Sequence, residues 1–444
     1  MLKTFPKGGV HPHENKFSAG KPIEIIELPK QVSIPVSQHL GAPAQPVVNK
    51  GDEVKVGQLI AKSAGFISAN IHSSVSGKVS KIEKILDSTG YKQTAIIIDV
   101  EGDEWLPEID RSTALVEDIE KITAEEIRAK IAQAGIVGLG GATFPTNVKI
   151  SIPQGKVCDN LIINAVECEP YLTSDHQLML EKSDEIIVGA RLLQKAAGAK
   201  KIYIGIENNK PDAIELLKKK AAKYQDIEVV ALKVKYPQGG EKQLIKAVVN
   251  REVPSGGLPI DVGCVVQNVG TAYAVYEAVQ KNKPLIERVV TVTGKSVPKP
   301  SNLLVRIGTP VSNLIEKAGG LPEDTGKIVN GGPMMGKAVK DFSIPVTKGT
   351  SGILLIKSDE AKRPKTYNCI RCARCVFVCP MGLEPYLIKN MATVGMFEEL
   401  QNERVLDCME CGSCSFGCPA GVPLLDYIRL GKANLNKILR SKKS

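Results

Sequence analysis

Residues Cys369–Pro380 read CIRCARCVFVCP, and residues Cys408–Pro419 read CMECGSCSFGCP. Each run has the spacing C-x2-C-x2-C-x3-C-P, with which bacterial ferredoxins hold four-iron clusters. Zinc is an alternative because C-x2-C pairs also bind it, but a zinc site needs four ligands and not two identical runs that end in Cys-Pro. A disulfide framework is a weaker alternative, because the chain has the features of a cytosolic protein. The two runs therefore predict two [4Fe-4S] clusters.

In two-cluster ferredoxins the fourth cysteine of each run ligates the other cluster. The segment between the two runs, residues 385–407, is rich in helix formers, so we expect a helical ferredoxin-like domain over residues 368–425. The rule predicts a first cluster held by Cys369, Cys372, Cys375 and Cys418, and a second cluster held by Cys379, Cys408, Cys411 and Cys414.

Composition sets the class of protein. The chain has 444 residues, of which 43% are hydrophobic, so it is long enough for several domains with cores of their own. Its net charge is +10, but the basic residues are spread along the chain and aromatic residues make up only 4%. These features argue against nucleic acid as a partner. The chain has neither a signal peptide nor an apolar run of 18 residues, so we expect a soluble protein.

The stretch Gly138–Lys149, GLGGATFPTNVK, is glycine-rich but fits neither common nucleotide motif. It lacks the Walker pattern, and it follows the helical pattern EEIRAKIAQAG rather than the strand of a dinucleotide fingerprint. Two iron–sulfur clusters in one chain carry single electrons. A flavin is the usual converter between a hydride and single electrons, so we interpret this loop as a flavin site.

The chain is predicted to be a multidomain α/β protein. Residues 35–100 show short β segments with glycine turns, as in a lipoyl-like barrel-sandwich domain, and no lysine lies between Lys62 and Lys78 to carry a modification. Strand and helix patterns alternate over 115–285, which predicts a Rossmann-like parallel sheet with helices on both faces, including a helix over residues 175–197. The remaining regions are an N-terminal extension (1–34), a β-grasp-like module of the SLBB type (286–358) and a basic C-terminal helix or tail (426–444).

Four blocks resemble the NADH-oxidising flavoprotein subunit of respiratory complex I. The glycine-rich loop is similar to that family's GRGGAGFPTGLK, and three further blocks follow in the same order: NAVECEP (164–170), YPQGGEKQL (236–244) and VVQNVGT (265–271). With FPKGGVHPHENK (5–16) in front and the two clusters behind, the whole chain resembles the RnfC family, whose members belong to Rnf-type complexes that couple ferredoxin:NAD⁺ redox chemistry to ion translocation. The resemblance implies FMN and NAD(H) as cofactors, other subunits of a membrane-bound complex as partners, and a peripheral position on the cytoplasmic face of the cell membrane.

The resemblance also implies roles for single residues. It places the flavin at the glycine loop, near Lys149, and at the polar residues that follow two strands; Glu169 and Glu241 correspond to acidic positions near the nicotinamide. The residues assigned to cofactor binding are Gly138, Gly140, Gly141, Lys149, Asn164, Glu167, Glu169, Glu241, Asn268 and Thr271. No side chain is assigned as a catalytic acid or base, because hydride transfer to a flavin requires mainly placement. We expect Gly141→Val to abolish FMN binding, on the premise that this glycine has φ > 0.

Three departures from the family pattern leave alternatives open. Leu139 stands where the family has arginine, Val166 where it has aspartate, and Gly240 where it has glutamate. One alternative is therefore a non-catalytic wiring subunit in which only the clusters work, and another is a soluble flavin-dependent dehydrogenase. The cysteines outside the two runs, Cys158, Cys168 and Cys264, are interpreted as buried thiols.

The tail is predicted to be one amphipathic helix. An apolar stripe runs through Leu424, Ile428, Gly431, Leu435 and Ile438. We expect this stripe to pack on the cluster domain. The alternative is a membrane or partner contact through the basic residues Arg429, Lys432, Lys437, Arg440, Lys442 and Lys443.

Overall fold

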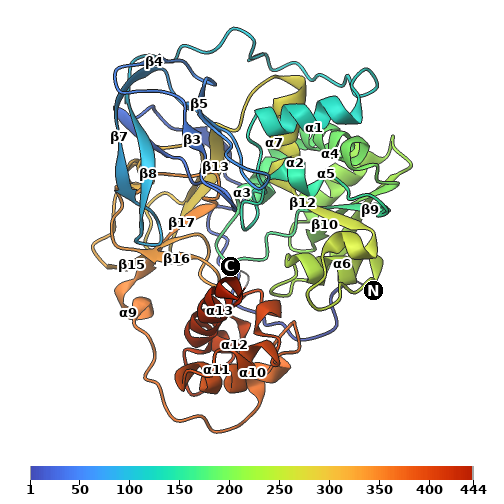
Figure 1. Ribbon diagram of the computed structural model, residues 1–444, viewed down its shortest axis with the longest axis vertical. Coiled ribbons are helices and arrows are strands. Elements are labelled where there is room, and N and C mark those ends of the chain that lie inside the picture. Colours follow the sequence, from blue (N-terminus) through green and yellow to red (C-terminus); the bar gives the residue numbers. More distant parts are fainter. Residues whose placement is uncertain (1, 443–444) are drawn as a thin grey trace.

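The computed structural model describes residues 2–442. Its α/β domain, on the right in Figure 1, is built on a sheet of four parallel strands in the order β11-β10-β9-β12. Leu161 and Ile163 join the core on one face of the sheet, and Ile162 joins the core on the other. Both faces are therefore covered, which explains why these strands read as continuous hydrophobic runs. The predicted parallel sheet is confirmed. Its strands are β9 (Asn160–Asn164), β10 (Lys201–Glu207), β11 (Ile227–Leu232) and β12 (Cys264–Asn268).

Helices cover both faces of this sheet. Helices α4 and α7 contact each other and pack on one face together with α1, whereas α6 packs on the other face. The helix predicted over residues 175–197 is instead two helices, because the chain leaves helical geometry at Lys182 and the sequence Ser-Asp-Glu that follows starts a new helix. The bounds are α1 (Ala124–Gln133), α2 (Thr146–Lys149), α3 (Ser174–Glu181), α4 (Ser183–Ala197), α5 (Pro211–Ala221), α6 (Glu241–Val249), η1 (Pro259–Val262) and α7 (Val269–Gln280).

The barrel-sandwich domain has two small antiparallel sheets, in the orders β2-β8-β7-β4 and β3-β5-β6. Its core residues alternate along the strands: Val32 and Ile34 are fully buried on β2, opposite Ile98 and Ile96 on β8. The strands are β2 (Gln31–Pro35), β3 (Gln45–Pro46), β4 (Glu53–Val54), β5 (Leu59–Lys62), β6 (Ile71–His72), β7 (Gly77–Leu86) and β8 (Lys92–Val100).

The SLBB-type module is a six-stranded sheet in the order β1-β14-β13-β17-β15-β16. Strands β13 and β14 form an antiparallel pair. Strand β1 comes from the N-terminal extension and lies parallel to β14, a pairing that the sequence analysis missed because three residues carry too little pattern. The bounds are β1 (Ile23–Ile25), β13 (Glu287–Thr293), β14 (Ser301–Arg306), α8 (Val311–Lys317), β15 (Thr325–Asn330), β16 (Lys337–Val339) and β17 (Gly352–Lys357).

The cluster domain is helical, as predicted, and follows the linker that begins at α9 (Figure 1). Helices α11 and α13 pack against each other over a core that includes Ile388, Leu400 and Ile428. The bounds are α9 (Ser358–Ala361), α10 (Arg374–Phe377), α11 (Pro385–Thr393), η2 (Glu399–Gln401), η3 (Val405–Asp407), α12 (Ser413–Phe416) and α13 (Leu424–Ser441).

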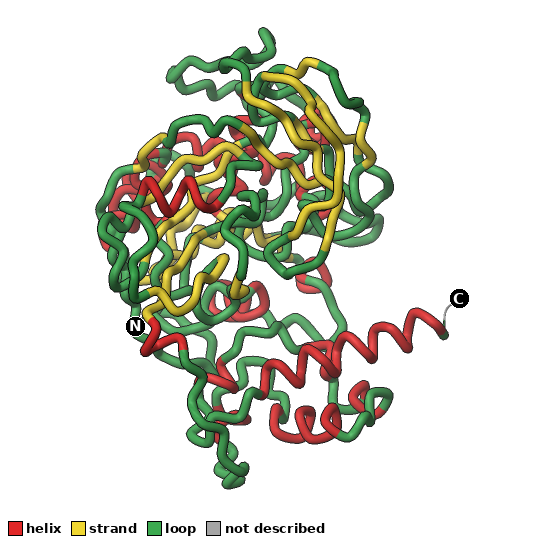
Figure 2. Tube along the Cα trace, turned by 90° about the vertical axis from the view of Figure 1, so that its left-hand side faces the viewer, coloured by secondary structure: helices red, strands yellow, loops and turns green. Residues whose placement is uncertain are grey.

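Helix α13 confirms the predicted stripe: Leu424, Ile428, Gly431 and Leu435 are buried, and Ile438 is partly buried. Its C-terminal end projects from the body of the molecule (Figure 2).

Two of the basic residues of α13 point back into the domain, because Arg429 and Lys432 both pair with Glu410, at 2.9 and 2.8 Å. Lys442 pairs with Glu398 at 2.8 Å, and Lys443 lies outside the described residues.

Among the described helices, none has the length and hydrophobicity that a membrane crossing requires.

Candidate functional site

The strand order reverses between β9 and β12, and in open α/β sheets such a reversal leaves a crevice beyond the carboxyl ends of the two strands. From β9 the chain proceeds outward to β10 and β11 on one side, and then returns to β12 on the other side. Open α/β sheets bind their ligands at such a reversal. Asn164 and Asn268 are register partners and end their strands together at this point. Both residues were assigned to the flavin, and the structure brings them side by side.

The two asparagines fix the loops that leave the sheet. Asn268 caps α7, because its Oδ1 accepts a hydrogen bond from the backbone N–H of Gly270 at 2.8 Å, and its Nδ2 donates to Asp175 at 2.7 Å. Asn164 donates to the carbonyl of Gly239 at 2.9 Å and accepts from the N–H of Val166 at 3.2 Å. The start of the twelve-residue helix α7 therefore faces the crevice with a fixed geometry.

The glycine-rich loop reaches the same crevice from α1. The backbone N–H of Leu139 donates to Thr271 Oγ1 at 2.9 Å, so the predicted site residue Thr271 holds the loop. A Cβ on Gly140 would lie 2.8 Å from Asn268 Nδ2, so this glycine is required for close approach. A Cβ on Gly141 would meet nothing within 4 Å, and neither Gly138, Gly140 nor Gly141 has a positive φ. The premise that Gly141 needs φ > 0 is wrong: the loop leaves space there and turns elsewhere, with Thr143 at φ 53°.

Arg288 is a buried residue of this site that the sequence analysis missed. It lies on β13, only 6% exposed, and its Nη1 donates to the carbonyls of Leu139 at 3.2 Å and Lys348 at 2.6 Å. Among residues 2–442 its other guanidinium N–H groups have no hydrogen-bond partner. Burial lowers the pKa of Arg288 to about 10, against the opposing field of Asp175. The SLBB-type module thus contributes a cation to the glycine loop, and no motif marks it.

The chain after β9 is a strained loop that carries two of the predicted acidic residues. Glu167 has φ 48°, and its carboxylate accepts hydrogen bonds from the backbone N–H groups of Asp175 at 2.8 Å and His176 at 3.2 Å. It therefore caps the N-terminus of α3. Burial raises the pKa of Asp175 to about 6, and the neighbouring Glu167 raises it further, whereas Asn268 and Arg288 lower it.

Glu169 joins the flavin domain to the SLBB-type module. Its carboxylate accepts from the N–H groups of Met334 at 3.1 Å and Met335 at 2.8 Å, in the glycine-rich segment after β15. Burial raises the pKa of Glu169 to about 7, although both hydrogen bonds act to lower it. This carboxylate is therefore occupied in holding a loop, and the structure does not bring it together with Glu241.

Lys149 and Glu241 form an ion pair of 2.5 Å between the end of α2 and the start of α6. Their side chains are 29% and 39% exposed, so solvent reaches the pair. The resemblance implied separate roles for the two residues, and the structure instead places them opposite each other. The Lys149 ammonium has two further N–H groups, so the pair leaves it able to contact an anionic ligand.

The cysteines of the two runs fit the predicted second cluster. Four cysteines from both runs line one small, mainly apolar cavity: Cys379, Cys408, Cys411 and Cys414. Burial raises the pKa of Cys414 to about 12, and the neighbouring Cys408, Cys411 and Cys379 raise it further. Backbone N–H groups already donate to two of these sulfurs, from Leu383 to Cys379 and from Glu410 to Cys408, both at 3.4 Å. Four thiols with amide donors are the ligand set of a four-iron cluster.

The predicted first cluster is less enclosed. Burial raises the pKa of Cys375, and the neighbouring thiol of Cys418 raises it further. Cys369 and Cys372 are exposed. Among residues 2–442, no three His, Cys, Asp or Glu side chains converge on a single-ion position. Outside the runs, Cys158 and Cys264 are buried, as predicted, and the partly buried Cys168 accepts a hydrogen bond from the N–H of Gly239 at 3.4 Å.

Four family models match successive parts of the chain. They are the RnfC barrel sandwich hybrid domain (residues 3–103), the Nuo51 FMN-binding domain (131–277), the SLBB domain (289–338) and a 4Fe-4S dicluster domain (362–421). These matches confirm the predicted types of domain and the two kinds of cofactor. The predicted residue boundaries and the assignment of single site residues stay predictions.

Curated relatives match nearly the whole chain. The C component of the proton-translocating ferredoxin:NAD(+) oxidoreductase complex of Clostridium ljungdahlii is 48% identical, over 91% of this chain and 87% of the relative. The C component of the Na(+)-translocating ferredoxin:NAD(+) oxidoreductase complex of Acetobacterium woodii is 44% identical, over 89% of each. The C component of the ion-translocating oxidoreductase complex of Rhodobacter capsulatus is 41% identical, over 89% of this chain and 77% of the relative.

A solved structure shares the fold. A chain of an NAD+-reducing [NiFe]-hydrogenase in the H2-reduced state superposes with a TM-score of 0.51 at 18% identity, and the match covers 73% of this chain and 65% of that chain. At this identity the likeness concerns the fold alone.

Proposed function

The chain belongs to the RnfC family of ion-translocating ferredoxin:NAD⁺ oxidoreductase complexes, and from that premise we propose that it is the subunit at which NAD(H) exchanges electrons with the complex. It has an FMN-binding domain and a 4Fe-4S dicluster domain. FMN supplies the conversion between a hydride and single electrons. The residues of the chain bind and orient the two redox groups and hold them at a fixed separation.

The observation that carries this proposal is a single loop that contacts both the strand ends and the second cluster cavity. Tyr236 begins the loop that also contains Gly239, the partner of Asn164, and its hydroxyl donates to the carbonyl of Cys411 at 2.8 Å. Tyr236 is only 2% exposed and packs against Cys411 in one hydrophobic cluster. This contact is buried and excludes solvent, which suits electron transfer between the two sites.

In the crevice, the proposed FMN contacts are Gly138, Gly140, Gly141, Lys149, Asn164, Glu167, Asn268 and Thr271. Their backbone N–H groups and the start of α7 suit the anionic part of the flavin. Glu241, at the mouth, stays the proposed contact for NAD(H). Glu169 acts on the same site through the loop it holds, because both of its carboxylate oxygens are bound to the segment of Met334 and Met335.

The non-catalytic alternative rests on Leu139, Val166 and Gly240, and the fold accounts for two of these departures. A Cβ on Gly240 would lie 2.5 Å from Met409 Cε and 2.6 Å from Gln243 Oε1, so a side chain there would have to displace Met409 of the cluster domain. Arg288 brings to Leu139 the positive charge that the family carries at that position. Both observations support a rearranged site over a lost one.

The chain acts as one subunit of a membrane complex, and its finer contacts are part of the proposal. We place it at the cytoplasmic face as a peripheral subunit, bound through other subunits of the complex and through the basic end of α13. NAD(H) is the proposed small-molecule partner, and nucleic acid is not.

Anaerobic reconstitution with iron, sulfide and FMN, followed by titration with NADH, tests the proposal. We expect NADH to bleach the flavin absorption near stoichiometric addition and then to reduce the clusters, seen by electron paramagnetic resonance. A protein that takes up both clusters but no FMN would support the wiring alternative instead. Flavin that binds but is not reduced by NADH would refute the role proposed for Glu241 and its surroundings.

A further inference from the structure

We propose that the N-terminal strap, defined as residues 5–16, is a positioning element shared by both cofactor sites: it seats the Cys379 turn of the second cluster and locks the loop that carries Glu167 and Glu169. This inference rests on the proposed function for its flavin half only. The strap reads FPKGGVHPHENK and runs between the α/β domain and the cluster domain (Figure 1).

The first part of the strap touches the cluster domain. The backbone N–H of Gly9 donates to the carbonyl of Val378 at 2.9 Å, one residue before Cys379. Gly8 has φ 68°, and a Cβ at this position would lie 2.5 Å from the carbonyl carbon and oxygen of Cys379. The strap thus lies directly against the backbone of a predicted ligand, at a distance that only glycine allows.

The middle of the strap is paired with the flavin domain. Val10 and Tyr236 exchange both backbone hydrogen bonds, at 2.8 and 2.9 Å, and Tyr236 in turn reaches the carbonyl of Cys411. Val10 is 7% exposed and belongs to the same hydrophobic cluster as Tyr236 and Cys411. One short segment therefore contacts both sides of the seam between the two cofactor regions.

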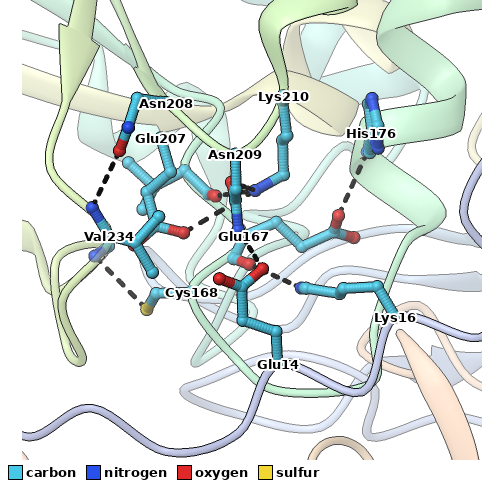
Figure 3. A network of polar contacts seen from close by, with 12 residues as sticks. Glu14, Lys16, Glu167, Cys168, His176, Glu207, Asn208, Asn209, Lys210 and Val234 are labelled. Atoms are coloured by element: carbon cyan, nitrogen blue, oxygen red, sulfur yellow. Dashed lines mark hydrogen bonds and ion pairs between the residues drawn. The ribbon is translucent and has the colours of Figure 1, made fainter.

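The end of the strap locks the strained loop after β9. The ammonium of Lys16 lies beside Glu167 and donates to its backbone carbonyl at 3.0 Å (Figure 3). It also donates to the backbone carbonyls of Glu169 at 2.9 Å and Leu172 at 2.6 Å. Two residues of this loop, Glu167 at φ 48° and Tyr171 at φ 71°, have left-handed backbone that only surrounding contacts can maintain. Tyr171 is also held by the strap, because its N–H donates to the carbonyl of Glu14 at 2.8 Å.

The Lys16 contact is specific and not ordinary packing. Burial lowers the pKa of Lys16, whereas the nearby Glu167 and Glu207 raise it. The Lys16 ammonium donates all three of its hydrogen bonds to carbonyls of one loop and so fixes that loop as a unit. A hydrogen bond from a charged donor contributes more to stability than one between neutral groups.

The cluster half is tested by Gly8→Ala, with Gly20→Ala as the matched control. Gly20 has φ 71°, nearly the same as Gly8, but its Cβ would meet nothing within 4 Å, so the two variants share the backbone strain and differ only in the contact with Cys379. We expect reconstituted Gly8→Ala to lose the second cluster, so that iron falls from about eight to about four atoms per chain. The signal of the first cluster should remain, and Gly20→Ala should keep both. Equal iron in the two variants would overturn the cluster half.

The flavin half is tested by Lys16→Met, with Lys21→Met as the control because Lys21 is exposed on the same extension. We expect FMN to bind at least about tenfold more weakly to Lys16→Met, with iron content unchanged, and Lys21→Met to match the unsubstituted protein. Unchanged FMN affinity in Lys16→Met would overturn this half. If the unsubstituted protein bound no FMN, the proposed function would fail, while the Gly8 experiment would still decide the cluster half.

Discussion

At the residue scale, the site depends on charged groups that are buried or partly buried and paired with backbone. Arg288 binds two carbonyls, Glu169 binds two N–H groups, and Lys16 binds three carbonyls. Each of them ties a loop of one region to an element of another. Removing one of these side chains leaves backbone groups without a hydrogen-bond partner. The free-energy cost of leaving such a group unpaired exceeds the net stabilisation from an ordinary hydrogen bond.

Arg288→Met is expected to weaken FMN binding by about tenfold or more, because the glycine loop loses its bond at Leu139 and the crevice loses a cation. Arg288→Lys keeps the charge but not the planar fork and should restore only part of the affinity. Titration of the apo-flavin protein with FMN, followed by quenching of flavin fluorescence, measures both variants. The iron content should be the same in all three proteins, and a loss of iron in parallel with FMN would indicate general misfolding instead.

Glu169 predicts a pH dependence of stability. Burial raises its folded-state pKa to about 7, above the usual carboxyl value, so the folded protein favours the protonated form more than the unfolded chain does. Its contribution is therefore fully present below about pH 4.5 and is lost as the pH rises through about 7, on the order of 1–3 kcal/mol. Glu169→Gln should flatten the thermal stability between pH 5 and 8 relative to the unsubstituted protein.

The control for Glu169 is Glu215→Gln, on the exposed face of α5. This variant should keep the slope of the unsubstituted protein. A Glu169→Gln variant with the same slope as the control would contradict the assignment of the pH dependence to this carboxylate.

At the element scale, the crevice is made by loops that meet at the reversal between β9 and β12. The glycine loop also borders the crevice, and two of its glycines have different surroundings: Gly140 lies against Asn268, whereas Gly141 borders open space. Neither position requires a left-handed backbone.

Gly141→Val is therefore expected to fold normally and still lose FMN. A Cβ at this position meets no protein atom within 4 Å, so the valine should fit beside the loop and the thermal midpoint should change little. We expect no measurable FMN binding, with both clusters intact by electron paramagnetic resonance. Stoichiometric FMN in this variant would show that the flavin lies elsewhere in the crevice.

At the scale of the whole molecule, the flavin domain, the SLBB-type module and the cluster domain meet around one seam. Tyr236, Met334, Met409 and Cys411 come from these three regions and pack in a single cluster with Val10 of the strap. The cluster domain also presents α13, whose C-terminal end projects outward (Figure 2).

Deletion of residues 440–444 tests the proposed membrane contact of the tail. The deletion removes three basic residues, Arg440, Lys442 and Lys443, and each basic residue near an anionic surface contributes about 1 kcal/mol. We expect the truncated protein to wash off membranes at lower salt than the full chain, with the largest difference at low ionic strength, where screening is weakest. FMN and cluster content should stay the same.

The matched control replaces Lys50, Lys218 and Lys219 by glutamine, which removes three exposed positive charges elsewhere. It should behave as the full chain does in the salt washes. Equal retention of the truncated and full-length proteins would assign membrane docking to other surfaces and leave the tail with packing and solvation alone.

Local signals in the sequence were sufficient for the chemistry of the clusters and for the types of domain. The cysteine spacing, the alternation of strand and helix patterns over residues 115–285 and the stripe of α13 depend on neighbours along the chain, so periodicity and spacing reveal them. Asn164 and Asn268 were assigned through the resemblance of their sequence blocks to the flavoprotein family. The break between two helices at Lys182 was not predicted, because two adjoining helices produce one continuous periodic pattern.

Only the tertiary structure decided which distant groups meet. Arg288, Lys16 and the ion pair of Lys149 with Glu241 join segments between 60 and 156 residues apart, and isolated lysines or arginines carry no local pattern. Gly240 looked like the loss of a functional acid, yet its neighbour Met409 comes from another domain. The positions of these groups follow from how whole domains pack, because burial and close contact are properties of the folded surface and not of any short stretch of chain.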